Sequence, residues 1–307
     1  MLGLETPVER LQHMNQPAYE FYLNRNPGID LAADRLEIGV CAQHNNGGID
    51  VDLWWRSSIA GLFPVGEAAG AHGVARPGGA ALNSAQVGAT RAAQWIAARE
   101  QGAARADEGW QELAGDALQK ARSLLEAACG REESSGVLID DVLMESTRAM
   151  SDNAGLVRSR QGLEELARNV AEWRRRVGDE CVVAPTSRRS VDRLFLVRDI
   201  LDVQAVYVAA MLDHLDHGVG SRGSVLYTDP DGDLPVSWWN DGADLDVEEI
   251  FRHRLDSKAH HGVTQRVSVD AVGEAIHAHW GPVRPIPTED EFLENVWKTY
   301  RVDHNIH

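Results

Sequence analysis

The stretch SSIAGLFPVGEAAGAHGVARPGGAALNSAQVGATRAAQW, residues 57–95, decides the fold. Its apolar run, residues 59–65, predicts a strand that ends at Gly66. Four glycines between residues 70 and 79 then surround one histidine and one arginine, and the small residues from Ala80 onward predict a helix. This order of strand, glycine-rich loop and helix brings backbone N–H groups and a helix N-terminus close to an anionic or electron-accepting ligand.

The composition limits the class of protein. A chain of 307 residues with 43% hydrophobic content can form one large domain or two to three smaller ones. Its net charge of -17 argues against nucleic acid or an anionic membrane as partner, and no apolar run is long enough to predict a membrane span. The polar N-terminus does not resemble a secretion signal, and the 3 cysteines are widely spaced. We therefore expect a cytoplasmic protein without a disulfide framework.

The hydrophobic pattern changes twice along the chain. Residues 5–24 predict a helix broken at Pro17, and two further strands are predicted before the organising stretch, over residues 36–41 and 49–53. Apolar positions three and four residues apart then predict four helices, over residues 107–129, 137–152, 160–177 and 191–217. The remainder predicts strands near 224–228 and 263–269 and a helix over 290–300. We expect three domains, residues 1–104, 105–217 and 218–307.

Three polar side chains stand out near the glycine-rich loop. His44 precedes two amides and two glycines, where an imidazole can donate to a carboxylate or carbonyl, or can bond the local backbone. Arg76 lies among glycines and can bind a carboxylate bidentately, or can form a salt bridge that stabilises the loop. Glu67 suits recognition of sugar-like hydroxyls, or it can cap the following turn.

Histidines and tryptophans form the remaining clusters. The C-terminal region carries His253, His260, His261, His277, His279, His304 and His307. Only His277 and His279 have a spacing that a strand would place on one face, so we expect surface histidines and no metal site. The pairs Trp54–Trp55 and Trp238–Trp239 are expected to pack in a core or an interface.

Four pieces of the sequence resemble, in order, one protein family. GLFPVGEAAGAHGVARPGGAAL, residues 61–82, is similar to the C-terminal flavin-contacting segment of the fumarate reductase, succinate dehydrogenase and L-aspartate oxidase flavoproteins. AQHNNGGIDVD, residues 42–52, resembles the strand and turn of that family that read HYTMGGI. Residues 150–177 resemble its helical domain, and Ser221-Arg222-Gly223 resembles a Ser-Arg-Gly element that follows it. The resemblance extends over about residues 36–224.

The resemblance implies a fold of class α/β plus α. The chain would comprise the C-terminal part of an FAD-binding α/β domain, a small helical domain and a mixed C-terminal region. Glu67, preceded by Gly66, would hold the ribityl hydroxyls of FAD. The pyrimidine edge of the flavin would lie against Gly78, Gly79, Ala80, Ala81 and Leu82. His44 and Arg76 would be catalytic and would bind a substrate carboxylate together with His72.

The sequence also departs from the family. Family members begin with a strand and a GxGxxG segment that holds the FAD pyrophosphate, whereas this sequence opens on a helix-like segment. Ala80-Ala81 replaces an Asn-Ser pair. We therefore expect a component of an FAD-dependent oxidoreductase that transfers hydride between flavin and a carboxylate-bearing substrate. A partner chain would carry the N-terminal FAD-binding half, or the protein would form a homo-oligomer. The alternatives are a non-catalytic subunit or scaffold with a vestigial flavin fold, and a carbohydrate- or acid-binding module.

Overall fold

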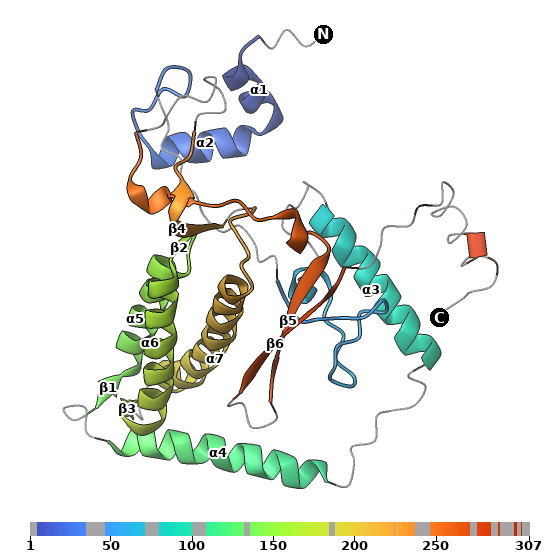
Figure 1. Ribbon diagram of the computed structural model, residues 1–307, viewed down its shortest axis with the longest axis vertical. Coiled ribbons are helices and arrows are strands. Elements are labelled where there is room, and N and C mark those ends of the chain that lie inside the picture. The colour runs from blue at the N-terminus through green and yellow to red at the C-terminus, as the bar shows by residue number, and fades with distance from the viewer. Residues whose placement is uncertain are drawn as a thin grey trace. The chain divides into compact units, whose positions relative to one another are not determined.

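The computed structural model divides the chain into two compact units, residues 1–45 and 46–307 (Figure 1). It describes residues 5–34, 47–70, 80–99, 109–131, 136–183, 188–223, 225–236, 246–270 and 275–283, and the positions 288, 298–299 and 302. The helices of the described residues are α1 (Pro7–Met14), α2 (Gln16–Arg25), α3 (Ala80–Arg99), α4 (Trp110–Gly130), α5 (Ile139–Asn153), α6 (Arg160–Asp179) and α7 (Arg188–Asp216). Short 3₁₀ turns are η1 (Gly66–Ala69), η3 (Glu249–Phe251) and η4 (Lys258–His260). The strands are β1 (Val137–Leu138), β2 (Val157–Arg158), β3 (Cys181–Val182), β4 (Leu226–Asp233), β5 (Val263–Val269) and β6 (Ile276–Pro282).

The first unit contains two short helices that meet at Asn15. The side chain of Thr6 accepts a hydrogen bond from the Glu9 backbone and Glu9 bonds back to Thr6, so a capping box starts α1. Asn15 both ends α1 and caps α2 by accepting from the backbone N–H of Ala18. The sequence predicted a break at Pro17, but the break falls at Asn15. Pro17 lies in the first turn of α2, where its missing N–H leaves no intrahelical hydrogen bond unmade.

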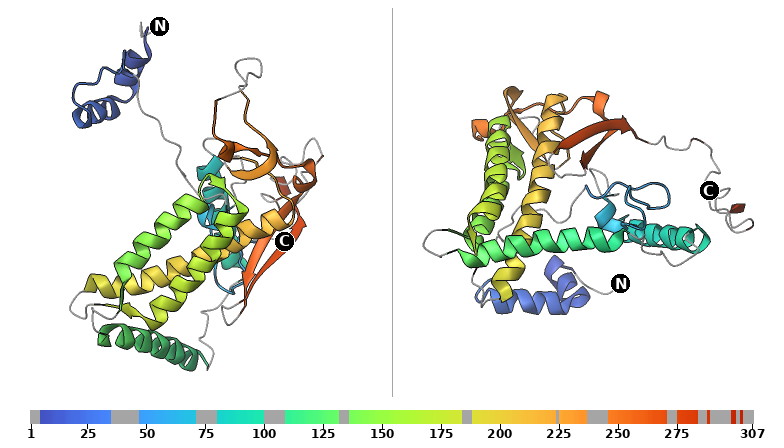
Figure 2. Two further views of the ribbon diagram at one scale, coloured as in Figure 1. Left: turned by 60° about the vertical axis from the view of Figure 1, so that its left-hand side comes forward. Right: turned by 90° about the horizontal axis from the view of Figure 1, so that it is seen from below.

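Helices α5, α6 and α7 pack side by side as a bundle (Figures 1 and 2). Ion pairs from Arg160 to Asp216, at 2.9 Å, and from Arg174 to Asp202, at 2.8 Å, show that α6 and α7 run antiparallel. Apolar residues three and four apart on each helix face the shared core. Its fully buried members include Leu163, Leu166, Val170 and Val177 of α6 and Leu194, Val197, Leu201 and Val208 of α7. The helices predicted over residues 137–152, 160–177 and 191–217 are confirmed, and α4 corresponds to the helix predicted over residues 107–129.

Three two-stranded pairs complete the second unit. β1 pairs with β3 and β2 pairs with β4, both in parallel, while β5 and β6 form an antiparallel hairpin. In the hairpin register, Gln265 lies directly opposite Trp280. The strands predicted near residues 224–228 and 263–269 are therefore confirmed. The mixed helix and strand content agrees with the expected combination of α/β and α structure.

Two predicted strands are wrong. Residues 47–65 adopt turns and irregular structure without a strand. The Asp52 carboxylate accepts backbone hydrogen bonds from Trp54, at 2.8 Å, and from Arg56, at 3.1 Å, and so closes a turn where the sequence predicted a strand over residues 49–53. Ser57 similarly bonds the backbone N–H of Ile59, at 3.1 Å, at the start of the other predicted strand, residues 59–65. The strand predicted over residues 36–41 and most of the helix predicted over 290–300 lie outside the described residues.

Candidate flavin-binding site

Glu67 lies in η1, a single 3₁₀ turn bounded by two glycines in the left-handed region. Gly66 has φ 63° and Gly70 has φ 62°, a conformation that favours glycine at both positions. The backbone N–H of Ile49 donates to the carbonyl of Ala68, at 2.8 Å. A Cβ added to Gly48 would collide with the backbone of Gly70, so the two chain segments touch directly. The turn therefore presents Glu67, whose side chain is exposed, from a tightly constrained backbone.

Two close contacts hold η1 and the preceding Asp52 turn against α3. A Cβ on Gly66 would lie 3.0 Å from the Cβ of Ala85, and a Cβ on Gly88 would lie 2.6 Å from the indole of Trp55. Trp55 is buried and has φ 61°, a conformation that costs about 1–2 kcal/mol for a bulky residue. The Asp52 turn fixes this conformation, because the N–H of Trp55 donates to the Asp52 carbonyl at 3.1 Å. Glycine at these two positions allows η1 and α3 to approach each other.

Tryptophan and arginine side chains extend the same contact along α3. The rings of Trp54 and Trp95 lie 5.8 Å apart. The guanidinium of Arg91 covers Trp54 at 4.4 Å, and that of Arg56 covers Trp95 at 4.0 Å. Such cation–π contacts contribute about 0.5–2 kcal/mol each. The prediction that Trp54 and Trp55 pack in a core is confirmed, while Trp238 and Trp239 lie outside the described residues.

The predicted cofactor residues fall into two groups. Gly66 and Glu67 lie in η1, and Ala80, Ala81 and Leu82 form the first turn of α3. The contact between Gly66 and Ala85 brings the two elements together, so the exposed Glu67 and a helix N-terminus belong to one local assembly. Leu82 is 72% exposed. The other predicted site residues, His44, His72, Arg76, Gly78 and Gly79, lie outside the described residues.

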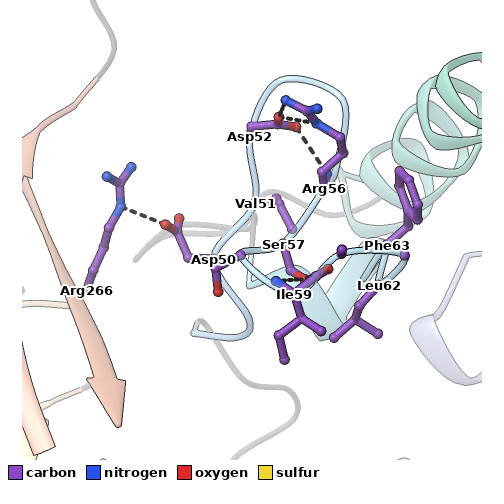
Figure 3. A pocket seen from close by; sticks show the side chains of 12 residues that line it. Asp50, Val51, Asp52, Arg56, Ser57, Ile59, Leu62, Phe63 and Arg266 are labelled. Atoms are coloured by element: carbon purple, nitrogen blue, oxygen red, sulfur yellow. Dashed lines mark hydrogen bonds and ion pairs between the residues drawn. The ribbon is translucent and has the colours of Figure 1, made fainter. Parts of the chain in front are cut away.

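A cavity of about 520 Å³ lies beside the segment that leads to Gly66 (Figure 3). Arg266 of β5 reaches Asp50 at 3.0 Å, and Arg56 pairs with Asp52 at 2.7 Å. Burial works to raise the pKa of Asp52, but hydrogen bonds from the backbone and side chain of Arg56 outweigh it and lower that pKa. Because these four charged groups already pair with one another, the cavity shows no charge that calls for a ligand. No pattern in the sequence predicted this cavity, although Asp52 and Arg56 have the four-residue spacing of an ion pair.

Of the seven C-terminal histidines, the structure describes His253, His260, His261, His277 and His279, while His304 and His307 lie outside the described residues. Within the part of the chain that the structure describes, no group of three or more His, Cys, Asp or Glu side chains is placed to hold a metal ion. His277 and His279 lie on β6, where no strand was predicted, and the hydroxyl of Ser268 lies 3.2 Å from His279 Nε2. None of the described helices combines the length and the apolar character needed to cross a membrane.

Comparison with known proteins gives the class of fold: that of the flavoprotein subunits of fumarate reductase and succinate dehydrogenase. E. coli quinol fumarate reductase FrdA aligns with a TM-score of 0.67 and 19% identity, over 94% of this chain and 45% of that chain. The Sdh1 complex of Mycobacterium smegmatis in its apo form aligns with a TM-score of 0.59 and 21% identity, over 97% of this chain and 46% of that chain. At these identities the likeness concerns the fold alone.

Sequence similarity identifies a particular relative. The chain is 29% identical over 153 residues to a subunit of the fumarate reductase (CoM/CoB) of Methanothermobacter marburgensis. That alignment covers 50% of this chain and 26% of the relative, and this chain spans less than half the length of the solved chains it matches. No family model matches the sequence. The resemblance to the C-terminal half of these flavoproteins is confirmed.

Proposed function

We propose that this chain is the flavin-end half of an FAD-dependent oxidoreductase component. The supporting observation is the assembly of η1 and α3, in which close glycine contacts fix an exposed Glu67 beside the start of a helix. Those two features match what the ribityl chain and the pyrimidine edge of a flavin require: a hydroxyl acceptor and a positive helix end. The similarity to the fumarate reductase (CoM/CoB) of Methanothermobacter marburgensis supports the same proposal.

In this proposal the described residues bind one end of FAD. Gly66 and Glu67 hold the ribityl hydroxyls, because an exposed carboxylate on a constrained turn can accept from two of them. Ala80, Ala81 and Leu82, with Gly78 and Gly79 before them, lie against the pyrimidine edge. Bound FAD would supply the hydride acceptor or donor, and the helix N-terminus would stabilise the negative charge of the reduced ring. Because alanine is small, residues 80 and 81 allow the backbone N–H groups of this turn to approach the flavin ring.

The substrate in this proposal is a small molecule that bears a carboxylate. His44 and Arg76 orient it, and His72 adds a third polar group. A guanidinium binds a carboxylate through two parallel hydrogen bonds, and an imidazole polarises the group that gains charge. The proton donor would come from outside this chain.

We also propose the division into residues 1–104, 105–217 and 218–307, with the bundle of α5, α6 and α7 as the core of the helical domain. A reducing, cytoplasmic location belongs to the proposal and is supported by the free thiols of Cys129 and Cys181.

The proposed partner is a chain that carries a dinucleotide-binding GxGxxG segment and a capping domain, or alternatively a second copy of this chain. Large apolar side chains are exposed around the proposed site: Ile59 is 64% exposed, Leu82 72% and Val87 55%. Apolar side chains of this size favour burial against another surface.

Flavin binding tests the proposal directly. The full chain is purified alone and after co-expression with a candidate partner of that type, and absorbance in the flavin bands is measured. Glu67→Gln should weaken FAD binding about 10- to 100-fold, since a hydrogen bond to a charged acceptor contributes about 1.5–3 kcal/mol. Glu112→Gln, an exposed glutamate in the first turn of α4, is the matched control and should bind like the wild type. Absence of flavin from both wild-type preparations would overturn the proposal.

A non-catalytic scaffold is the second candidate, and one observation favours it. The core shared by α5, α6 and α7 is closed and apolar, so this part of the fold needs no cofactor to remain intact. Stable complex formation with a partner in the absence of any flavin would favour the scaffold. Binding of a dicarboxylate without FAD would instead indicate an acid-binding module.

A further inference from the structure

The β5–β6 hairpin contacts the C-terminal end of α7 through one carboxylate. Asp213 Oδ2 accepts from Trp280 Nε1 of β6, at 2.8 Å, and from Gln265 Nε2 of β5, at 2.6 Å. The Gln265 amide also donates to the carbonyl of Ala210, at 2.9 Å. Because Gln265 and Trp280 form a cross-strand pair, Asp213 binds β5 and β6 at the same position along the hairpin. We call these contacts the hairpin latch.

Three imidazole rings surround the indole of the latch. The ring centroids of His214, His217 and His260 lie 5.4, 4.9 and 6.3 Å from that of Trp280. His217 Nδ1 lies 3.3 Å from Asp213 Oδ1, and His260 Nδ1 lies 2.7 Å from Asp256 Oδ1. Each of these two rings therefore lies directly against a carboxylate.

His214 has different surroundings. Its Nδ1 lies 3.5 Å from the hydroxyl of Tyr227, a buried residue of β4, and a neutral hydroxyl does not compensate a positive charge. Burial lowers the pKa of His214, and the positive charge of Arg222 lowers it further. Arg158 acts in the same direction, while the nearby carboxylates of Asp213 and Asp256 oppose the shift without cancelling it. His214 is thus poorly suited to carry a proton in place.

The carboxylate of Asp256 is stabilised in its charged form. Burial works to raise the pKa of Asp256, but hydrogen bonds from the Gly220 backbone and from His260 outweigh it and lower that pKa. Arg222 lies 3.5 Å from the same carboxylate. The group that changes charge near neutral pH is therefore an imidazole.

We propose that the hairpin latch is pH-sensitive: protonation of His214 releases β5 and β6 from the end of α7. In the released state water reaches His214, whose pKa returns to its ordinary value near 6.5. The latched state then binds fewer protons than the released state, so the latch weakens as the pH falls below about 6.5. Release also breaks the ion pair from Arg266 to Asp50, which connects the hairpin to the segment that leads to Glu67. The inference does not depend on flavin binding.

Hydrogen exchange of the full chain tests the latch. Amide protection of β5 and β6, corrected for the intrinsic effect of pH on exchange, is compared at pH 7.5 and 5.5. Protection should fall by up to about tenfold, the limit set by one imidazole with an ordinary pKa near 6.5 in the released state. His214→Gln should remove this pH dependence. His277→Gln, on the exposed face of β6, is the matched control and should retain it.

Several results would overturn the inference. The first is a pH dependence of protection in His214→Gln that equals that of the wild type. The second is loss of the pH dependence in His217→Gln or His260→Gln while His214→Gln retains it. The third is protection of β5 and β6 in the wild type that does not change with pH. If His214→Gln does not fold, a wild-type series from pH 5 to 8 decides. One-proton dependence that begins near pH 6.5 supports the latch, whereas protection that stays constant from pH 8 to 6 and falls only toward pH 5 refutes it, because carboxylates titrate near pH 4.

Discussion

Substitution of Gly88 tests the contact that holds Trp55, in the turn before Glu67, against α3. A Cβ at this position would lie 2.6–2.8 Å from three atoms of the Trp55 indole, where an ordinary contact begins at 3.4 Å. The ring would have to move by about 0.8 Å, yet it is buried and the strained backbone of Trp55 limits its movement. Overpacking of this kind costs about 1–3 kcal/mol.

A helix nevertheless gains from the same change. Alanine is more favourable than glycine inside a helix by about 0.5–1 kcal/mol, so Gly88→Ala should destabilise α3 by a net amount of about 1–2 kcal/mol. Gly115→Ala is the matched control. Gly115 lies in α4, and a Cβ added there would meet no described atom within 4 Å. This variant should therefore stabilise its helix by the full propensity difference.

Hydrogen exchange measures both effects in the full chain. Protection of α3 amides in Gly88→Ala should fall about tenfold, because about 1.4 kcal/mol corresponds to a factor of ten. Protection of α4 amides in Gly115→Ala should rise about two- to fivefold, since that variant gains about 0.5–1 kcal/mol. If Gly88→Ala is as well protected as the wild type while Gly115→Ala behaves as expected, Trp55 does not pack on α3 as described and the account of the site is wrong.

Three further predictions concern the bundle. Gln204 is 6% exposed and its Oε1 has no hydrogen-bond partner among the described residues. Gln204→Leu should therefore raise the free energy of unfolding, measured by chemical denaturation, by about 1 kcal/mol. A decrease would contradict this prediction. Leu201 is fully buried, and Leu201→Ala should lower that free energy by about 2–5 kcal/mol, which a value below about 1 kcal/mol would refute. Burial raises the pKa of the Cys181 thiol to about 11. At pH 8 iodoacetamide should therefore modify Cys181 more slowly than the partly exposed Cys129, and mass spectrometry of peptides measures both rates. Equal rates in the folded protein would contradict this prediction.

The helical bundle could be predicted because the three- and four-residue spacing of apolar residues recurs several times along its helices. Leu163, Leu166, Val170, Trp173 and Val177 recur at three- and four-residue spacing, and all five are buried. The segment before Glu67 gave a misleading signal. Apolar residues that alternate with acidic residues are typical of a strand. The Asp52 carboxylate instead accepts hydrogen bonds from the backbone of its own turn, and these bonds compete with strand pairing. The hydrophobic periodicity of the sequence carries no information about such bonds.

The sequence predicted Glu67 and the start of α3 as neighbours only through a family resemblance. The physical reason for their proximity lies at Gly66 and Gly88, and neither glycine differs in the sequence from glycines that face open space. The hairpin latch could not be predicted either. Asp213 and Trp280 are 67 residues apart, and the spacing of the histidines suggested only a loop-rich surface.

The two cores of the second unit differ in size, and this bears on the need for a partner. The bundle core contains many fully buried side chains, whereas the core beside Glu67 consists, among the described residues, of Trp55, Ala69 and Ala92 with a few half-buried neighbours. So small a core excludes little apolar area from water, and side chains such as Leu82 remain exposed next to it. Burial of these side chains against another surface would stabilise the assembly of η1 and α3, which supports the proposed partner chain.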